Sequence, residues 1–184
     1  MIQSDFNTVG ELVALAEAQH VPVHEIVLKR EMHDRERSRG EVLQEMLKNW
    51  QVMQESIVRG IQNTERSLSG MTGGDAKKLY AYRASGYMGE AAIEAAAYAV
   101  GISEVNAVMG RIVACPTAGS CGIVPAALYA AKKQRRLADG DIVLALLTAA
   151  GIGMVVDQNA SIAGAAGGCQ AEVSIPCEVR IDSG

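Results

Sequence analysis

The stretch Glu41-Val-Leu-Gln-Glu-Met-Leu-Lys-Asn-Trp-Gln-Val-Met-Gln-Glu-Ser-Ile-Val-Arg-Gly-Ile61 decides the fold class. Its large apolar residues recur at intervals of three and four, and they are Val42, Met46, Trp50, Met53, Ile57 and Ile61. That spacing puts them on one face of an α-helix. We therefore expect one long amphipathic helix from Arg35 to about Leu68, with its apolar stripe in the core.

Helix signals continue on both sides of this stretch. Thr8-Val9-Gly10-Glu11 fits a capping box at a helix start, and Pro22 suits the first turn of the next helix. Shorter helices are expected at about 76–84, 88–100, 103–113, 123–137 and 140–156. No stretch alternates with the period of two that a β-strand requires. The sequence therefore predicts an all-α helical bundle.

Composition and charge limit the class of protein. The chain has 184 residues, 49% of them hydrophobic, and a net charge of -4. This suits a globular fold of one ordinary domain with an appendage. The longest basic run, Lys132, Lys133, Arg135 and Arg136, is interpreted as the solvated end of a helix, so we expect no nucleic-acid partner.

Charge is distributed unevenly along the chain. Residues 1–70 hold 19 charged side chains, whereas residues 84–131 hold only four. A nearly uncharged segment must be covered on several sides, by the rest of the chain or by a partner. We therefore expect charged N-terminal helices over 1–70, an apolar helical domain over 71–173 and an atypical tail over 174–184.

Neither a leader peptide nor a membrane span is expected. The first residues lack a basic start followed by an apolar run. The most apolar stretch, Ile142 to Val156, has about 15 residues, and a membrane span needs about 20. We interpret this stretch as a buried helix of a cytoplasmic protein that has no membrane partner.

Two polar loops interrupt the apolar half, at 115–122 and 157–170. Small hydroxyl residues at a helix start offer backbone N–H groups to a carboxylate or phosphate, but a close helix crossing would select the same small residues. Both interpretations stay open on the residues alone. The four cysteines match no zinc or ferredoxin spacing, and no Ser/His/Asp or Cys/His arrangement is visible. The cysteines are Cys115, Cys121, Cys169 and Cys177.

Four segments together resemble one family. They are Ser69-Gly-Met-Thr-Gly-Gly-Asp-Ala-Lys-Lys78, Glu104-Val-Asn-Ala-Val-Met-Gly110, Pro116-Thr-Ala-Gly-Ser-Cys-Gly-Ile-Val-Pro125 and Asn159-Ala-Ser-Ile-Ala-Gly-Ala-Ala-Gly-Gly-Cys-Gln-Ala-Glu172. In this order they resemble the α chain of bacterial iron–sulfur-dependent L-serine dehydratase, an L-serine ammonia-lyase. The resemblance runs from near the N-terminus to about Val173.

The resemblance implies a helical domain that turns L-serine into pyruvate and ammonia. The family uses a four-iron four-sulfur cluster instead of pyridoxal phosphate, with one iron acting as a Lewis acid on the serine hydroxyl. In two-chain members a β chain pairs with the α chain, and association into a homo-oligomer is also expected. Cys169, in Gly-Gly-Cys-Gln, matches a cluster ligand of the family.

The same resemblance implies residues for the substrate. Thr117, Gly119 and Ser120 match the family's Pro-Thr-x-Gly loop, which would suit the substrate carboxylate. Asn159 and Ser161 match the loop that leads into the ligand cysteine, and they are candidates for hydrogen bonds to the substrate or to a ligand. Cys115 and Cys121 match no family ligand. The residues do not name a proton-abstracting base.

The resemblance stops after Val173. The family continues with two further cluster cysteines, whereas this chain reads Ser174-Ile-Pro-Cys-Glu-Val-Arg-Ile-Asp-Ser-Gly184. Cys177 echoes the family's Val-Pro-Cys and is the second candidate metal ligand. We therefore expect the C-terminal part of the domain to be missing. The alternative to an enzyme subunit is a catalytically incomplete helical interaction module. Without its cluster and the missing helices, the chain should expose apolar surface near residues 142–156 and associate.

Overall fold

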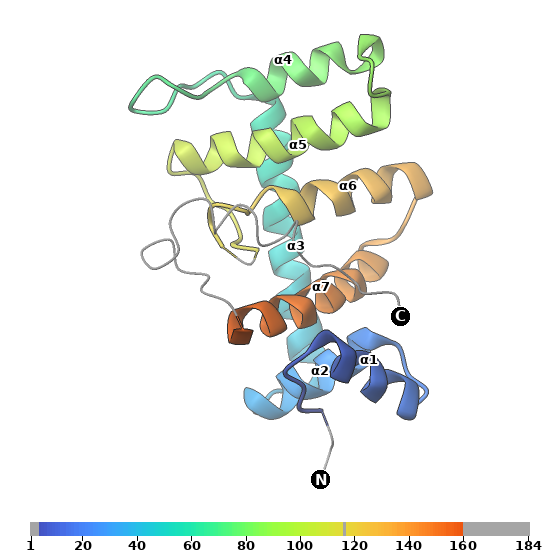
Figure 1. Ribbon diagram of the computed structural model, residues 1–184. Coiled ribbons are helices and arrows are strands. Elements are labelled where there is room, and N and C mark those ends of the chain that lie inside the picture. Colours follow the sequence, from blue (N-terminus) through green and yellow to red (C-terminus); the bar gives the residue numbers. More distant parts are fainter. Residues whose placement is uncertain (1–3, 116, 160–184) are drawn as a thin grey trace. The chain divides into compact units, whose positions relative to one another are not determined.

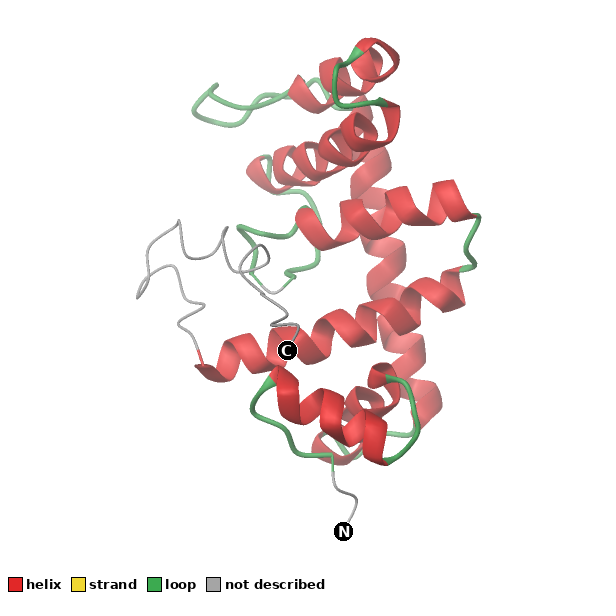
Figure 2. Cartoon of the chain, turned by 45° about the vertical axis from the view of Figure 1, so that its right-hand side comes forward, coloured by secondary structure: helices red, strands yellow, loops and turns green. Residues whose placement is uncertain are grey.

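The computed structural model of the protein describes residues 4–115 and 117–159. Within those residues it contains helices and loops and no strand, so the all-α prediction is confirmed (Figure 1 and Figure 2). The α-helices are α1 (Val9–Ala18), α2 (Val23–Asp34), α3 (Arg39–Gln62), α4 (Asp75–Tyr82), α5 (Glu90–Ala107), α6 (Ile123–Arg135) and α7 (Asp139–Asn159), with a 3₁₀ turn η1 (Arg83–Ser85) after α4.

The chain packs as two compact units. Of the described residues, one unit comprises 4–48 and 139–159, and the other comprises 49–115 and 117–138. Helix α3 begins in the first unit and continues into the second. These units are defined by which residues pack together, whereas the expected ranges 1–70, 71–173 and 174–184 were defined by composition. The expected ranges therefore stay a prediction.

The first unit begins with the expected capping box. Thr8 Oγ1 accepts a hydrogen bond from Glu11 N at 3.1 Å, and the Glu11 carboxylate accepts from Thr8 N at 3.3 Å. These bonds satisfy amides that have no partner inside the helix. The prediction for Thr8 and Glu11 is therefore confirmed. Pro22 stands one residue before α2, as its N-cap.

Helix α7 packs against α1 and α2 in the first unit. Leu12 of α1, Ile26 of α2 and Val155 of α7 share one buried cluster. A Cβ placed on Gly151 would lie 2.4 Å from Val27 Cγ2, so a glycine is needed where α7 passes α2. The helix has 21 residues and is long and apolar enough to span a membrane, by length and composition only. Its packing on two other helices favours a core helix, yet only 28% of its apolar window is buried.

The second unit is a stack of helices beside α3. Figure 1 shows α4, α5 and α6 in succession, and α5 packs against both of its neighbours. Tyr98 of α5 and Ala126 of α6 lie in one buried cluster with Ile57 of α3. A Cβ on Gly60 would lie 2.3 Å from the Gly101 carbonyl carbon, so α3 and α5 cross with their backbones almost in contact.

The structure corrects the expected ends of α3. The helix was expected over residues 35–68 and spans 39–62. Its start is displaced because Ser38 and Glu41 form a second capping box, in which Ser38 N donates to Glu41 Oε2 at 2.8 Å. After the helix, Asn63 Oδ1 accepts from Glu65 N at 2.9 Å, a local bond that competes with helix continuation.

The structure also replaces two expected helices by one. Residues 88–100 and 103–113 were expected to form separate helices, but α5 runs without a break from 90 to 107. Gly101 lies inside it because the close crossing with Gly60 selects a glycine there. Beyond α5, Met109 takes a positive φ of 57°, so the chain turns away before 113.

Candidate functional site

The expected substrate loop connects α5 to α6, and its hydroxyl groups bond to each other. Thr117 N donates to Ser120 Oγ at 3.3 Å, and Ser120 N donates to Thr117 Oγ1 at 3.2 Å. The two hydroxyl oxygens lie 2.8 Å apart, and Ser120 Oγ also donates to Cys115 O at 3.2 Å. Because Thr117 and Ser120 are 7% and 1% exposed, these hydroxyls shape the loop from inside.

The loop is attached firmly at both ends. On its N-terminal side, Ser56 Oγ of α3 donates to Arg111 O at 2.8 Å. On its C-terminal side, Cys121 is buried in the cluster formed by α3, α5 and α6. A Cβ on Gly122 would lie 2.4 Å from Ala99 O of α5, so the loop passes directly over that helix. This close crossing was one of the two interpretations that the sequence left open.

The tip of the loop is its exposed part. Ala118 and Gly119 are exposed, in contrast to Thr117 and Ser120 on either side. Asn106, in the last turn of α5, donates from Nδ2 to Ala118 O at 3.3 Å. The structure thus brings Thr117, Gly119 and Ser120 together in one loop, with the hydroxyl residues buried and Gly119 exposed.

The other expected site residues lie elsewhere. Asn159 is the last residue of α7 and belongs to the first unit. Its Nδ2 donates to Asn7 O at 2.7 Å and to Val155 O at 2.8 Å, so this side chain links the N-terminal segment to α7. Ser161, Cys169 and Cys177 lie outside the described residues, and their expected roles stay predictions.

Of the two described cysteines, Cys121 is buried and Cys115 is partly exposed. Burial, with a smaller contribution from the neighbouring Cys121, raises the pKa of Cys115 to about 11. Burial also raises the pKa of Cys121. Among residues 4–115 and 117–159, no group of three His, Cys, Asp or Glu side chains could hold a metal ion.

Glu104 is a functional candidate to which the sequence gave no role. Its side chain is 4% exposed, and its carboxylate accepts hydrogen bonds from Gly74 N at 3.1 Å, Asp75 N at 2.7 Å and Ala76 N at 3.3 Å. These amides form the N-terminus of α4, where a negative charge is favourable. The signal was present, since Glu104 is one of only four charged residues between 84 and 131.

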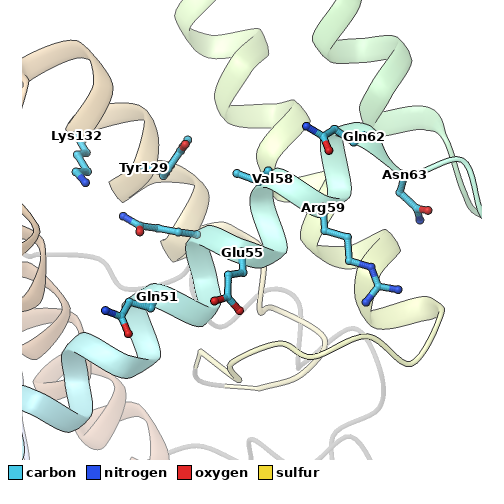
Figure 3. A pocket seen from close by; sticks show the side chains of 9 residues that line it. Gln51, Glu55, Val58, Arg59, Gln62, Asn63, Tyr129 and Lys132 are labelled. Atoms are coloured by element: carbon cyan, nitrogen blue, oxygen red, sulfur yellow. The ribbon is translucent and has the colours of Figure 1, made fainter.

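An open groove of about 840 Å³ lies elsewhere on the second unit. Figure 3 shows Tyr129 and Lys132 reaching it from α6, opposite side chains of α3. Of the expected site residues that the structure describes, which are Thr117, Gly119, Ser120 and Asn159, none lines this groove. Its lining consists of Gln51, Gln54, Glu55, Val58, Arg59, Gln62, Asn63, Tyr129 and Lys132.

Comparison with known proteins gives one consistent result. The family model described as serine dehydratase alpha chain matches residues 18–179. A probable L-serine dehydratase alpha chain of Bacillus subtilis is 41% identical over 170 residues, which cover 91% of this chain and 56% of that protein. No solved structure matches the chain.

Further relatives show the same partial coverage. The L-serine dehydratase alpha chain of Peptoniphilus asaccharolyticus is 36% identical over 168 residues, 90% of this chain and 58% of that protein. The L-serine dehydratase TdcG of Escherichia coli is 33% identical over 183 residues, 95% of this chain and 40% of that protein. The chain therefore spans about half the length of the relatives it matches.

Proposed function

Because this chain belongs to the serine dehydratase alpha-chain family, we propose that it is the alpha part of an L-serine dehydratase that forms pyruvate and ammonia. The observation that carries this proposal is the match to a named alpha chain at 41% identity over 91% of the chain. The construction of the 115–122 loop supports it, because a rigid loop with an exposed backbone tip suits recognition of a small carboxylate.

In this proposal the tip of the loop binds the serine carboxylate. The hydroxyls of Thr117 and Ser120 hold the loop in shape, and the backbone of Gly119 faces the substrate. The expected hydrogen bonds from Asn159 and Ser161 to the substrate or to a ligand residue stay predictions. The reaction removes the α-proton and the hydroxyl of serine as water, and the resulting enamine tautomerises to an imine that hydrolyses to pyruvate and ammonia.

The proposal assigns the cofactor to residues outside the described part of the chain. Cys169 and Cys177 are the proposed ligands of a four-iron four-sulfur cluster, and the described residues add no ligand set. When bound, such a cluster supplies Lewis-acid chemistry at the serine hydroxyl. A serine dehydratase β chain is the proposed partner, since two of the similar proteins are named alpha chains.

The test is pyruvate formation from L-serine. The chain is produced together with a β chain, reconstituted anaerobically with iron and sulfide, and assayed beside a longer version that carries the relative's residues beyond the match. We expect serine-dependent pyruvate in at least one of the two, lost on exposure to air. Cys169→Ser should abolish it, whereas Cys115→Ser, at a cysteine that matches no family ligand, should retain it.

Iron and sulfide content separates this proposal from an interaction module. If both versions bind the β chain but retain no iron or sulfide after desalting, the chain acts as a docking module. If iron is retained and no version forms pyruvate, the proposed reaction is wrong.

A further inference from the structure

A side chain that lies outside the loop orients the Ala118–Gly119 peptide at the loop tip. Asn106 Nδ2 donates to Ala118 O at 3.3 Å, and this is the only side-chain bond to the tip that the described part of the chain shows. In a trans peptide, the C=O and the following N–H point in opposite directions. Since the carbonyl of Ala118 faces Asn106, the N–H of Gly119 faces away from α5.

The orientation of this peptide matters because the loop has no free hydroxyl to offer. Thr117 Oγ1 and Ser120 Oγ bond to each other and to backbone groups of the loop. They are buried, whereas Gly119 is exposed. The group of this loop that can reach a carboxylate is therefore the backbone of the tip.

Helix α5, which carries Asn106, is itself held in place by contacts with α4 and with the loop. Glu104, two residues before Asn106, anchors the start of α4 through three amides, and Gly122 is pressed against Ala99 O. The last turn of α5 thus contacts the start of α4 on one side and the loop tip on the other. Figures 1 and 2 show the loop between α5 and α6 at this end of α5.

We propose that Asn106 is a positioning residue, which fixes the Ala118–Gly119 peptide so that the Gly119 N–H is presented to the carboxylate of the substrate. This inference rests on the proposed function for the identity of the substrate. It also explains why asparagine suits position 106. A neutral amide can donate to a carbonyl while adding no charge that would repel an approaching carboxylate.

The test is a titration of the isotopically labelled chain with L-serine, followed by the amide NMR signals. We expect the Gly119 amide to shift on binding. In Asn106→Asp, which keeps the shape but cannot donate to Ala118 O at neutral pH, the dissociation constant should rise about three- to ten-fold, as expected for one hydrogen bond. Asn106→Ala should behave similarly. Ser103→Ala, one turn earlier in α5, is the matched control and should bind serine as the unmodified chain does.

A wild-type Gly119 response in Asn106→Asp, at unchanged affinity, would overturn the inference. If no amide of the unmodified chain responds to serine, the proposed substrate is wrong. The positioning role of Asn106 is then tested by the hydrogen-exchange rates of the loop amides. Faster exchange of residues 117–121 in Asn106→Asp, with α4 unchanged, sustains that role. Unchanged exchange of these residues overturns it.

Discussion

At the scale of single residues, the second unit depends on one buried carboxylate. Glu104 satisfies three backbone amides at the start of α4, where Gly74 offers no side-chain cap. Its Oε1 accepts from two of them and its Oε2 from the third. A charged acceptor at a helix N-terminus is stabilising because it opposes the positive end of the helix dipole.

Glu104→Gln should lower the free energy of unfolding by about 1.5–3 kcal/mol, because the new amide group faces a donor and leaves it without an acceptor. Urea denaturation followed by circular dichroism measures this. The control is Glu90→Gln, in the first turn of α5, where the side chain is 60% exposed. It should lower the free energy of unfolding by less than about 1 kcal/mol. Equal effects of the two changes would contradict the capping role.

The raised pKa of Cys115 leads to a prediction about its reactivity. With a pKa of about 11 in the folded protein, against about 8.5 in an unfolded chain, its reactive thiolate is scarce at pH 8. Iodoacetamide should therefore modify Cys115 at least about a hundred-fold more slowly in the folded protein than in guanidinium. Peptide mass mapping measures the modification of Cys115. Equal rates in the folded and the unfolded protein would contradict this prediction. The folded protein holds this proton more tightly, so the thiol favours folding at neutral pH and loses that effect as pH rises toward 11.

At the scale of helices, the sequence predicted the elements better than their ends. Periodicity identified α3, which has a long, regular apolar pattern, and continuous apolar composition identified α7. The sequence predicted two helices over the span of α5, and the close crossing with Gly60 shows why a glycine stands at position 101 inside one helix. The roles of Glu104 and Asn106 could not be predicted, because their partners lie 29 and 12 residues away in the chain.

The close α3–α5 crossing predicts that one added methyl group at Gly60 lowers the stability of the fold. A Cβ on Gly60 would meet backbone atoms of Gly101 at 2.3–2.5 Å, and backbone cannot move aside as a flexible side chain can. Gly60→Ala should cost about 1–3 kcal/mol of stability by overpacking. Gly40→Ala, in the same helix with nothing within 4 Å, should be neutral or slightly stabilising. Thermal unfolding of both variants provides the comparison.

An ion pair between α2 and α3 predicts a pH effect. Arg39 donates to both oxygens of Glu25, each at 2.7 Å, and this bond holds the pKa of Glu25 below its ordinary value. A carboxylate with a lowered pKa stabilises the fold above its unfolded pKa, and the effect is lost as pH falls through the folded pKa. Arg39→Gln should therefore cost up to about 1 kcal/mol at pH 7 and nearly nothing near pH 2. Lys48→Gln makes the same charge change in α3 and controls for net charge. A loss of stability in Arg39→Gln that does not change with pH would contradict the ion pair.

At the scale of the whole molecule, α7 predicts how the chain behaves in solution. Ala145, Ala149, Ile152 and Val156 follow one another at helical spacing and are only partly buried. An apolar stripe of this kind favours association. We expect the chain to bind a hydrophobic dye and to grow in size with concentration in light scattering. Ile152→Glu should reduce both, whereas the neighbouring Gly153→Ala should reduce neither. A monodisperse monomer that binds no dye would contradict this prediction.

The carboxylate of Glu104 also couples the formation of α4 to that of α5. Helix α4 has eight residues, too few to be stable by itself in water. Its N-terminal amides find their acceptor in α5, so α4 gains this stabilisation only after the last turn of α5 has formed. We therefore expect the two helices to form as one cooperative unit. A ribosome must release residues beyond Glu104 before α4 can persist.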